Sequence, residues 1–351
     1  MRRKLPSALH RRAAVEWPTA ALVVAVYAAW LGAVAAVHRY GLAALPLPAL
    51  AACWYTSLQH ELLHGHPTRS RAVNRLLGLA PLAVWTPYDL YRQAHLAHHR
   101  DERLTHPGLD PESNYLAAAD YARLPRWARV LRTAQRTALG RFAFGPLLAV
   151  ASLCGDLFGR LRHGDFSHAR AWSLHLMLLA ALLWALDRWA GIGPLEYVLG
   201  AAYPALGLAM LRSLHEHRPA AAPGHRIVVN EAGFGWRLLF LCNNYHAVHH
   251  ALPGLPWHEL RAAYLADRDG WLRRNGGFLV RGYGPLLRRH ALTPVDSPVH
   301  PAFAGSPGDA RGRLAPAFRH DPAPPRLAAH VRRRPPRGRA AVAAHRPQPA
   351  P

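Results

Sequence analysis

Two apolar runs near the N-terminus restrict this chain to folds that insert into a membrane. Residues 19–37 contain no charged side chain, and a run of this length is about what spans the bilayer core. Residues 42–58 form a second run, and only four residues separate the two. The pattern predicts a tight helical hairpin rather than a cleavable signal peptide, whose apolar segment is shorter and is not followed at once by another.

A second hairpin is predicted further along the chain, where residues 171–186 and 195–211 are again apolar. The polar stretch between the hairpins, residues 59–170, holds two shorter apolar pieces at 76–85 and 142–158, which we interpret as interfacial or re-entrant. The sequence therefore predicts an all-α membrane protein with about four transmembrane helices in two hairpins.

The positive charge is concentrated on one side of these predicted spans. Lys and Arg number 43 against 20 Asp and Glu, which gives a net charge of +23. Residues 1–18 hold five of these cations and residues 59–170 hold fifteen, whereas the hairpin turns hold one each, Arg39 and Arg188. The positive-inside rule then places both termini and the long polar segment in the cytoplasm, at an inner membrane. Anionic lipid is the expected partner of this charge, and nucleic acid is not, because no nucleic-acid-binding motif accompanies it.

The composition changes near Asp296. Residues 296–351 hold 12 Pro and 10 Arg with little apolar periodicity, which predicts a disordered tail. Three parts are therefore expected: a basic cytoplasmic N-terminus (residues 1–18), a membrane domain (residues 19–295) and the tail (residues 296–351).

Histidine is unusually abundant, with 24 copies, and it clusters in four places. The clusters are HELLHGH at residues 60–66, HLAHH at 95–99, HEH at 215–217 and NNYHAVHH at 243–250. On a helix, residues at i, i+3 and i+4 share one face. Each of these clusters, called histidine boxes below, can therefore present two or three imidazoles to one point.

Imidazole binds iron, zinc, copper and nickel, and all four clusters fall on the predicted cytoplasmic side, where they can converge. Eight or nine imidazoles are too many for one ion. The spacing therefore predicts a site for two metal ions in a cytoplasmic helical cap that carries the histidine boxes.

The order of the boxes resembles the membrane-bound fatty acid desaturase/hydroxylase superfamily, a group of histidine-box di-iron enzymes. The resemblance rests on HELLHGH, HLAHH and NYHAVHHALPGLPW, supported by Pro87-Tyr88 and by residues 110–113 and 212–217, and it extends over roughly residues 20–300. It implies two Fe ions, with one more histidine supplied by a helix end ahead of the last box. The implied metal ligands are His60, His64, His95, His98, His99, His217, His246, His249 and His250.

His217 is preferred over His215 as the additional ligand. We expect the fourth span to continue as helix past Leu211, so that Ser213 and His217 share a face, while His215 lies about 160° away from His217 around the axis.

Polar side chains next to the boxes are expected to orient the imidazoles. The candidates are Glu61, His66, Asp89, Asp110, Glu112, Glu216 and Asn244. No catalytic residue is expected beyond the metal ligands. Trp54 and Tyr55 precede His60 by about one and a half helical turns and are expected to line a tunnel for an acyl chain, with the aromatic belt at the membrane surface as the alternative.

The resemblance implies an O2-dependent oxidoreductase that removes hydrogen from an unactivated C–H bond. Desaturation of a fatty acyl or other lipid chain is the first expectation, and lipid or carotenoid hydroxylation or ketolation on the same scaffold is the alternative. A separate electron donor such as a ferredoxin or a cytochrome b5-type protein is implied, since the chain has no nucleotide-binding glycine motif and no CxxC pair.

Two other classes of protein compete with this interpretation. Residues 60–64 also match the HExxH motif of a zinc metalloprotease, with Glu61 as the base, but that reaction leaves at least six well-spaced histidines unused. A histidine-rich membrane binding protein or an inactive homologue is disfavoured because every box is intact.

Overall fold

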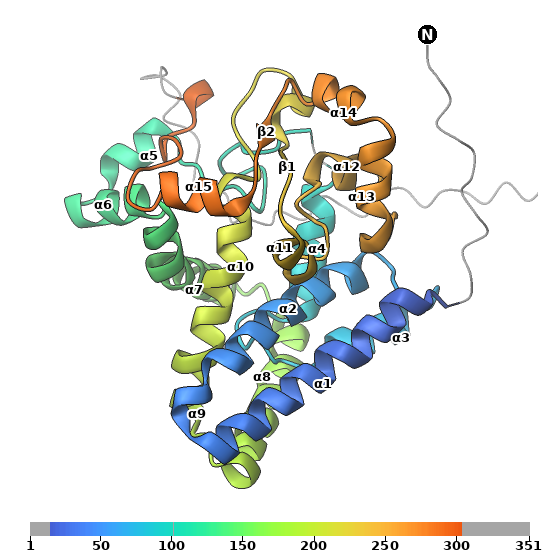
Figure 1. The fold of residues 1–351 in the computed structure, drawn as a ribbon. Helices are drawn as coiled ribbons and strands as arrows, with labels where there is room; N and C mark the ends of the chain where they lie inside the picture. The colour runs from blue at the N-terminus through green and yellow to red at the C-terminus, as the bar shows by residue number, and fades with distance from the viewer. Residues whose placement is uncertain (1–14, 101, 304–351) are drawn as a thin grey trace, which may run out of the picture. The chain divides into compact units, whose positions relative to one another are not determined.

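The computed structural model describes residues 15–100 and 102–303, and the fold within this part is mostly helical (Figure 1). Most of the predicted basic N-terminus, and the predicted tail from residue 304 onward, lie outside the described residues. The helices that make up the candidate membrane spans, together with α2, are α1 (Trp17–Tyr40), α2 (Pro46–Leu63), α7 (Ala138–Arg162), α8 (Ala169–Ala185), α9 (Pro194–Tyr197) and α10 (Tyr203–Arg212).

The remaining helices carry or cover the polar part of the fold, which we call the cap. They are α3 (Arg71–Gly78), α4 (Tyr88–His98), α5 (Ala118–Arg123), α6 (Arg126–Ala134), α11 (Phe234–Leu239), α12 (His246–Ala251), α13 (Trp257–Ala266), α14 (Arg268–Arg274) and α15 (Tyr283–Arg289). The strands β1 (Val229–Asn230) and β2 (Leu279–Val280) pair in parallel. Short 3-10 turns are η1 (Leu42–Ala44), η4 (Ser213–His215), η5 (Pro223–Arg226) and η6 (Pro301–Phe303), and π-helical turns are η2 (Leu186–Ala190) and η3 (Val198–Ala202).

The first predicted hairpin is present as α1 and α2, which run side by side (Figure 1). Helix α1 ends at Tyr40 and is capped by Gly41, whose φ of 79° is a conformation that glycine adopts without steric cost. The buried residues of α1 recur every three or four positions, as expected for one helical face; they include Leu22, Val26, Trp30, Ala33 and Val37.

Polar contacts tie the middle of α1 to the second hairpin. The indole of Trp30 donates to the hydroxyl of Tyr197, which in turn donates to the carbonyl oxygen of Leu82. These bonds satisfy polar groups in an apolar setting, where each unpaired group costs several kcal/mol, roughly.

Four helical stretches are long and apolar enough to cross a membrane: residues 17–40, 138–162, 169–190 and 194–215. The number of candidate spans equals the predicted four, but one member differs from the predicted set. Helix α2 falls outside it because its last turn carries Gln59, His60 and Glu61, which lower the mean hydropathy. Helix α7 enters the set because the apolar piece at 142–158 continues as helix in both directions.

The connections of α7 nevertheless favour the interfacial prediction. Its first residues are bonded to the cap, where Ala138 N–H donates to the carbonyl oxygen of His290. A few residues later, Arg141 donates to Ser213 at the cap end of α10. At its other end only residues 163–168 lead into α8, which forms a hairpin with α9 and α10 through the turn at Gly191. If α8 spans the bilayer towards Gly191, both ends of α7 lie on the cap side.

Reporter fusions test this topology. A reporter placed after Arg39 or Gly191 is expected on the periplasmic side. One placed after Arg170 is expected on the cytoplasmic side, as the two-hairpin topology with an interfacial α7 requires. Paired alkaline phosphatase and fluorescent-protein fusions report the two sides. A periplasmic signal at Arg170 would show that α7 spans the bilayer and would overturn the two-hairpin topology.

Candidate metal centre

Nine histidine side chains converge in two adjoining groups. All nine are the residues predicted as ligands, and within each group the nitrogen atoms lie within 4.8 Å of one another. The first group is His60, His64, His95, His99 and His249, and the second is His98, His217, His246 and His250.

The boxes do not each serve one group. Helix α4 directs His95 and His99 into the first group, while His98 joins the second. Helix α12 divides in the same way, because His249 lies in the first group and His246 in the second. An HxxHH box therefore bridges two centres, although its spacing alone suggested one shared point.

The imidazole nitrogens of each group face one another at short range. In the first group, His95 Nε2 lies 3.1 Å from His64 Nε2 and 3.0 Å from His99 Nε2. His249 Nε2 lies 3.1 Å from His99 Nε2. In the second group the corresponding Nε2 pairs are His217–His246 at 3.0 Å, His246–His250 at 3.1 Å and His98–His217 at 3.2 Å.

Hydrogen bonds among the rings cannot satisfy all of these nitrogens, because a neutral imidazole carries a single N–H. The Nδ1 atoms of His95 and His98 lie 2.8 and 2.7 Å from carboxylate oxygens of Glu112 and Asp110. With the proton held on Nδ1, the Nε2 lone pairs point into the centre of the group. Two nitrogens at right angles around one metal, each about 2.1 Å from it, lie about 3.0 Å apart. The observed spacing therefore fits a transition-metal ion in each group.

Burial and neighbouring charges shift the pKa values of rings in both groups. Burial, together with the neighbouring His95 and His99, lowers the pKa of the His64 imidazole to about 2. Burial acts in the same direction on His98, but the Glu112 and Asp110 carboxylates outweigh it and raise the pKa of His98 to about 9. His64 is thus neutral at pH 7, as a metal ligand must be. The carboxylates beside His98 favour positive charge there, which a bound metal ion would supply in place of the proton.

Four of the five predicted orienting acids lie beside the histidines. Asp110 and Glu112 hold His98 and His95, as above, and Glu216 Oε1 lies 3.4 Å from His246 Nδ1. Glu61 is close to His60, with 3.6 Å between Oε1 and Nδ1, and its Oε2 accepts the backbone N–H of Trp257.

The other predicted orienting residues have different partners. Asp89 pairs with Arg75, at 2.7 and 2.8 Å. The ring of His66 lies 2.9 Å from a carboxylate oxygen of Glu16 and belongs to neither histidine group.

Asn244 donates to the backbone carbonyl of Asn230 and not to a ring. Its neighbour Asn243 has the expected position, with Oδ1 3.0 Å from His246 Nδ1. Asn243 and Asn244 both precede α12, which begins at His246, and only the amide of Asn243 reaches the site.

His217 reaches the second group by a route that the sequence did not indicate. The expected helix through residue 217 is wrong: α10 ends at Arg212 and η4 ends at His215. The chain is then extended, and His217 pairs with Ile227 in an isolated β-bridge. His215 packs against the ring of Phe278, with the centroids 4.9 Å apart.

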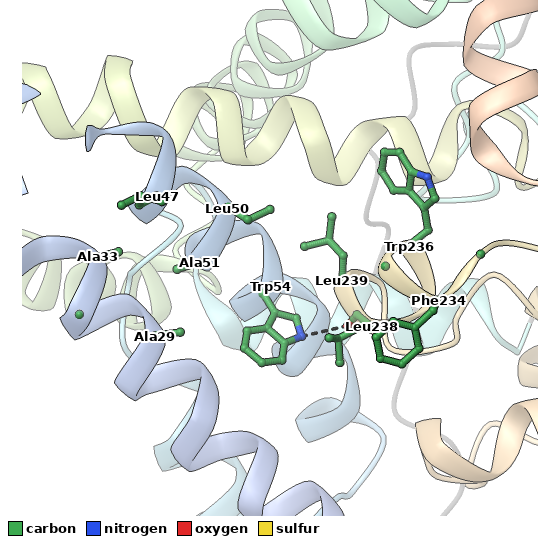
Figure 2. Close-up of a pocket in the computed structure, with 13 residues that line it drawn as sticks. Ala29, Ala33, Leu47, Leu50, Ala51, Trp54, Phe234, Trp236, Leu238 and Leu239 are labelled. Carbon is green, nitrogen blue, oxygen red and sulfur yellow. Dashed lines mark hydrogen bonds between the residues drawn. The ribbon is translucent and has the colours of Figure 1, made fainter. Parts of the chain in front are cut away.

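The two predicted tunnel residues lie in different surroundings. Tyr55 is fully buried, and its hydroxyl lies 2.8 and 2.7 Å from the carbonyl oxygens of Gly78 and Ala80, so it fixes α2 to the chain after α3. Trp54 lines an apolar groove of about 760 Å³ between α1, α2 and α11, and Figure 2 shows its indole donating to the carbonyl oxygen of Leu238.

A second cavity, of about 210 Å³, reaches the metal centre itself. His60 lines it together with residues of α2, α4, α10 and the end of α11, and its lining is more polar than that of the groove at Trp54. Besides His60, the polar residues that line it are Thr56, Ser57, Gln59, Thr86, Tyr91, Arg212 and Ser213. Sequence reasoning missed this lining, because no motif connects α10 with the first box.

Sequence reasoning also missed a support for the carboxylates, which comes from the segment after Val295. His300 is buried, and its Nε2 lies 3.1 Å from Thr105 Oγ1. Thr105 has a φ of 73°, an unusual conformation for a β-branched residue, and its N–H donates to Asp110 Oδ2. His300 thus supports a strained loop that in turn supports the acid facing His98.

The same segment is anchored by an ion pair. Asp296 pairs with the buried guanidinium of Arg136 and accepts from Tyr115. The structure therefore places residues 296–303 within the fold, although the sequence analysis assigned them to the tail. These eight residues contain no Arg, whereas all ten Arg of residues 296–351 lie beyond residue 303.

One comparison with known proteins gives a match. The family model described as "Fatty acid desaturase" matches residues 40–281, which include all four histidine clusters. No curated protein matches the chain.

Replacement of the two neighbouring histidines tests the assignment of His217. His217→Ala should lose part of the bound metal, because it removes one of four nitrogens from the second group, whereas His215→Ala should keep it. Metal per chain, measured by plasma mass spectrometry on purified protein, is the readout. Loss in His215→Ala with retention in His217→Ala would refute the assignment.

Truncation tests the role of residues 296–303. A chain ending at Phe303 should keep its metal and its melting temperature. A chain ending at Val295 should bind less metal and melt at a lower temperature. It leaves Arg136 buried without its partner, at a cost of about 3–5 kcal/mol. Asp296→Asn in the full chain removes only the ion pair with Arg136 and so measures its share of the effect. Equal behaviour of the two truncated chains would show that the segment does not support the site.

Proposed function

Because the chain belongs to the fatty acid desaturase family, we propose that it desaturates a fatty acyl or other lipid chain in an O2-dependent reaction at two iron ions. Membership makes the protein a membrane oxidoreductase of the desaturase/hydroxylase type. The observation that carries the finer proposal is the pair of adjoining histidine groups, in which six neighbouring Nε2 pairs lie 3.0–3.2 Å apart.

Each histidine group would hold one iron. Bound iron supplies the activation of O2 and the abstraction of hydrogen from an unactivated C–H bond. The protein's part is to keep the ligand nitrogens free: Glu112 and Asp110 accept the Nδ1–H of His95 and His98, which fixes the ring orientation and leaves each Nε2 available.

The cavity beside His60 is the proposed place of the reacting carbon. It is small and lined from α2, α4 and α10, so a chain within it has few orientations and displaces water from the centre. The apolar groove at Trp54 offers further contact for an alkyl chain, and each methylene that leaves water contributes about 0.8 kcal/mol.

The electron balance requires a partner. Reduction of one O2 to two water molecules takes four electrons and four protons. Formation of a C=C bond from two methylenes supplies two of each. The other two electrons would come from a separate donor, such as a ferredoxin or a cytochrome b5-type protein, and the other two protons from solvent.

The proposed location is the inner membrane, with the histidines facing the cytoplasm. The distribution of Lys and Arg supports this orientation. So does the position of the first box at the end of α2 that lies away from the hairpin turn.

The structure gives no support to the metalloprotease interpretation of residues 60–64. The Glu61 carboxylate accepts from the backbone of Trp257, and burial raises its pKa to about 8, so it is a poor base at neutral pH. His60 and His64 also share their group with three further histidines.

Lipid analysis tests the proposed reaction. Expression in a host of known lipid content should yield lipids that have lost two hydrogens, in an O2-dependent manner, by mass spectrometry. His249→Ala should abolish the product and lower bound iron, because it removes a nitrogen from the first group. His163→Ala, on an exposed turn outside both groups, is the matched control.

Products that gain one oxygen atom would assign hydroxylation on the same scaffold instead. Bound iron without any O2-dependent lipid product would refute the enzymatic proposal and favour a binding protein.

A further inference from the structure

The described surface has a cleft that joins arginine side chains to the metal centre. It encloses about 440 Å³ between the end of α2, α3, α4 and the chain at residues 253–254. Two members of the first histidine group, His64 and His99, line it. They are the only half-buried members of that group, since His60, His95 and His249 are buried. The cleft is therefore where the first group comes nearest to solvent.

The walls of this cleft are strongly basic. Arg71, Arg75, Arg92 and Arg100 line it, against one carboxylate, Asp89. Asp89 is committed to Arg75 through a two-point ion pair. Arg71, Arg92 and Arg100 form no ion pair with any described carboxylate, and Arg71 and Arg100 are exposed. The opening to the first histidine group thus carries uncompensated positive charge.

We propose that this arginine cleft is the docking surface for an acidic one-electron carrier protein, which delivers electrons through His64 and His99 to the first group. The inference rests on the proposed function, because only a reaction that consumes electrons requires such a partner. Complementary charge steers association and raises its rate, and a carrier seated here would place its redox group next to the exposed edges of two ligand rings. The step is an electron transfer: the carrier is oxidised by one electron and the metal centre is reduced by one, and it occurs twice for each O2.

Charge reversal in the cleft tests the proposal. The double variant Arg92→Glu/Arg100→Glu, loaded with iron in neutral detergent, is mixed without O2 with a photoreduced plant-type [2Fe–2S] ferredoxin as an acidic carrier. The rate of carrier oxidation is followed by the carrier's own absorbance. It should fall at least about ten-fold at low salt, and the difference from the unaltered protein should shrink at high salt, where charges are screened.

Three controls separate docking from damage. Arg288→Glu/Arg289→Glu reverses two exposed charges on α15, outside the cleft, and should leave the rate unchanged. Arg92→Lys/Arg100→Lys keeps the charge and should retain most of the rate. Reduction by a small neutral reductant, photoreduced 5-deazariboflavin, needs no docking surface and should proceed equally in all variants, with equal iron content.

An unchanged ferredoxin rate in the cleft variant, or an equal fall in the α15 variant, would overturn the proposal. So would a loss of co-purified anionic phospholipid from the cleft variant with the ferredoxin rate retained, because the arginines would then hold lipid head groups. The unaltered protein can also oxidise ferredoxin faster than the cleft variant and yet yield no O2-dependent lipid product. That result would refute the proposed function and leave the docking surface in place.

Discussion

The arrangement of this fold depends on one electrostatic constraint, the convergence of nine imidazoles whose lone pairs face one another. Such a cluster is unfavourable unless a cation occupies it, because buried acceptors without donors lose their hydrogen bonds to water. The carboxylates of Asp110 and Glu112 make the cation favourable by holding the protons on the far side of His98 and His95. Much of the described cap can be understood as support for these two acids and for the segments that carry the rings.

That support comes from distant parts of the chain. His300 lies 195 residues after Thr105, yet it holds the loop that positions Asp110. Asp296 and Arg136 fix the same C-terminal segment from the other side. A strained backbone position such as that of Thr105 persists only when its surroundings determine it. The packing of residues 296–303 therefore bears on the geometry of the metal centre, although none of these residues is a candidate ligand.

Helix α2 links the membrane part of the fold to the chemistry. Its first turns pack against α1, its middle residue Tyr55 is bonded to the chain after α3, and its end carries His60 and His64. The apolar groove at Trp54 and the cavity at His60 are both lined by this helix. A single rigid element thus fixes the distance between a surface for an alkyl chain and the atoms that would bind the metal.

The sequence by itself determined the class of fold, the number of candidate spans and all nine converging histidines, because each of these follows from local signals: run length, charge distribution and helical spacing. Only the tertiary structure decided how the histidines divide between two centres, since α4 and α12 each contribute to both. It also decided that His217 arrives on an extended segment after η4, that Asn243 rather than Asn244 contacts His246, and that His300 supports the site. These features depend on where helices end and on contacts between distant residues, and neither has a periodic signature in the chain. Local pattern indicated which histidines converge, and long-range packing set their partners.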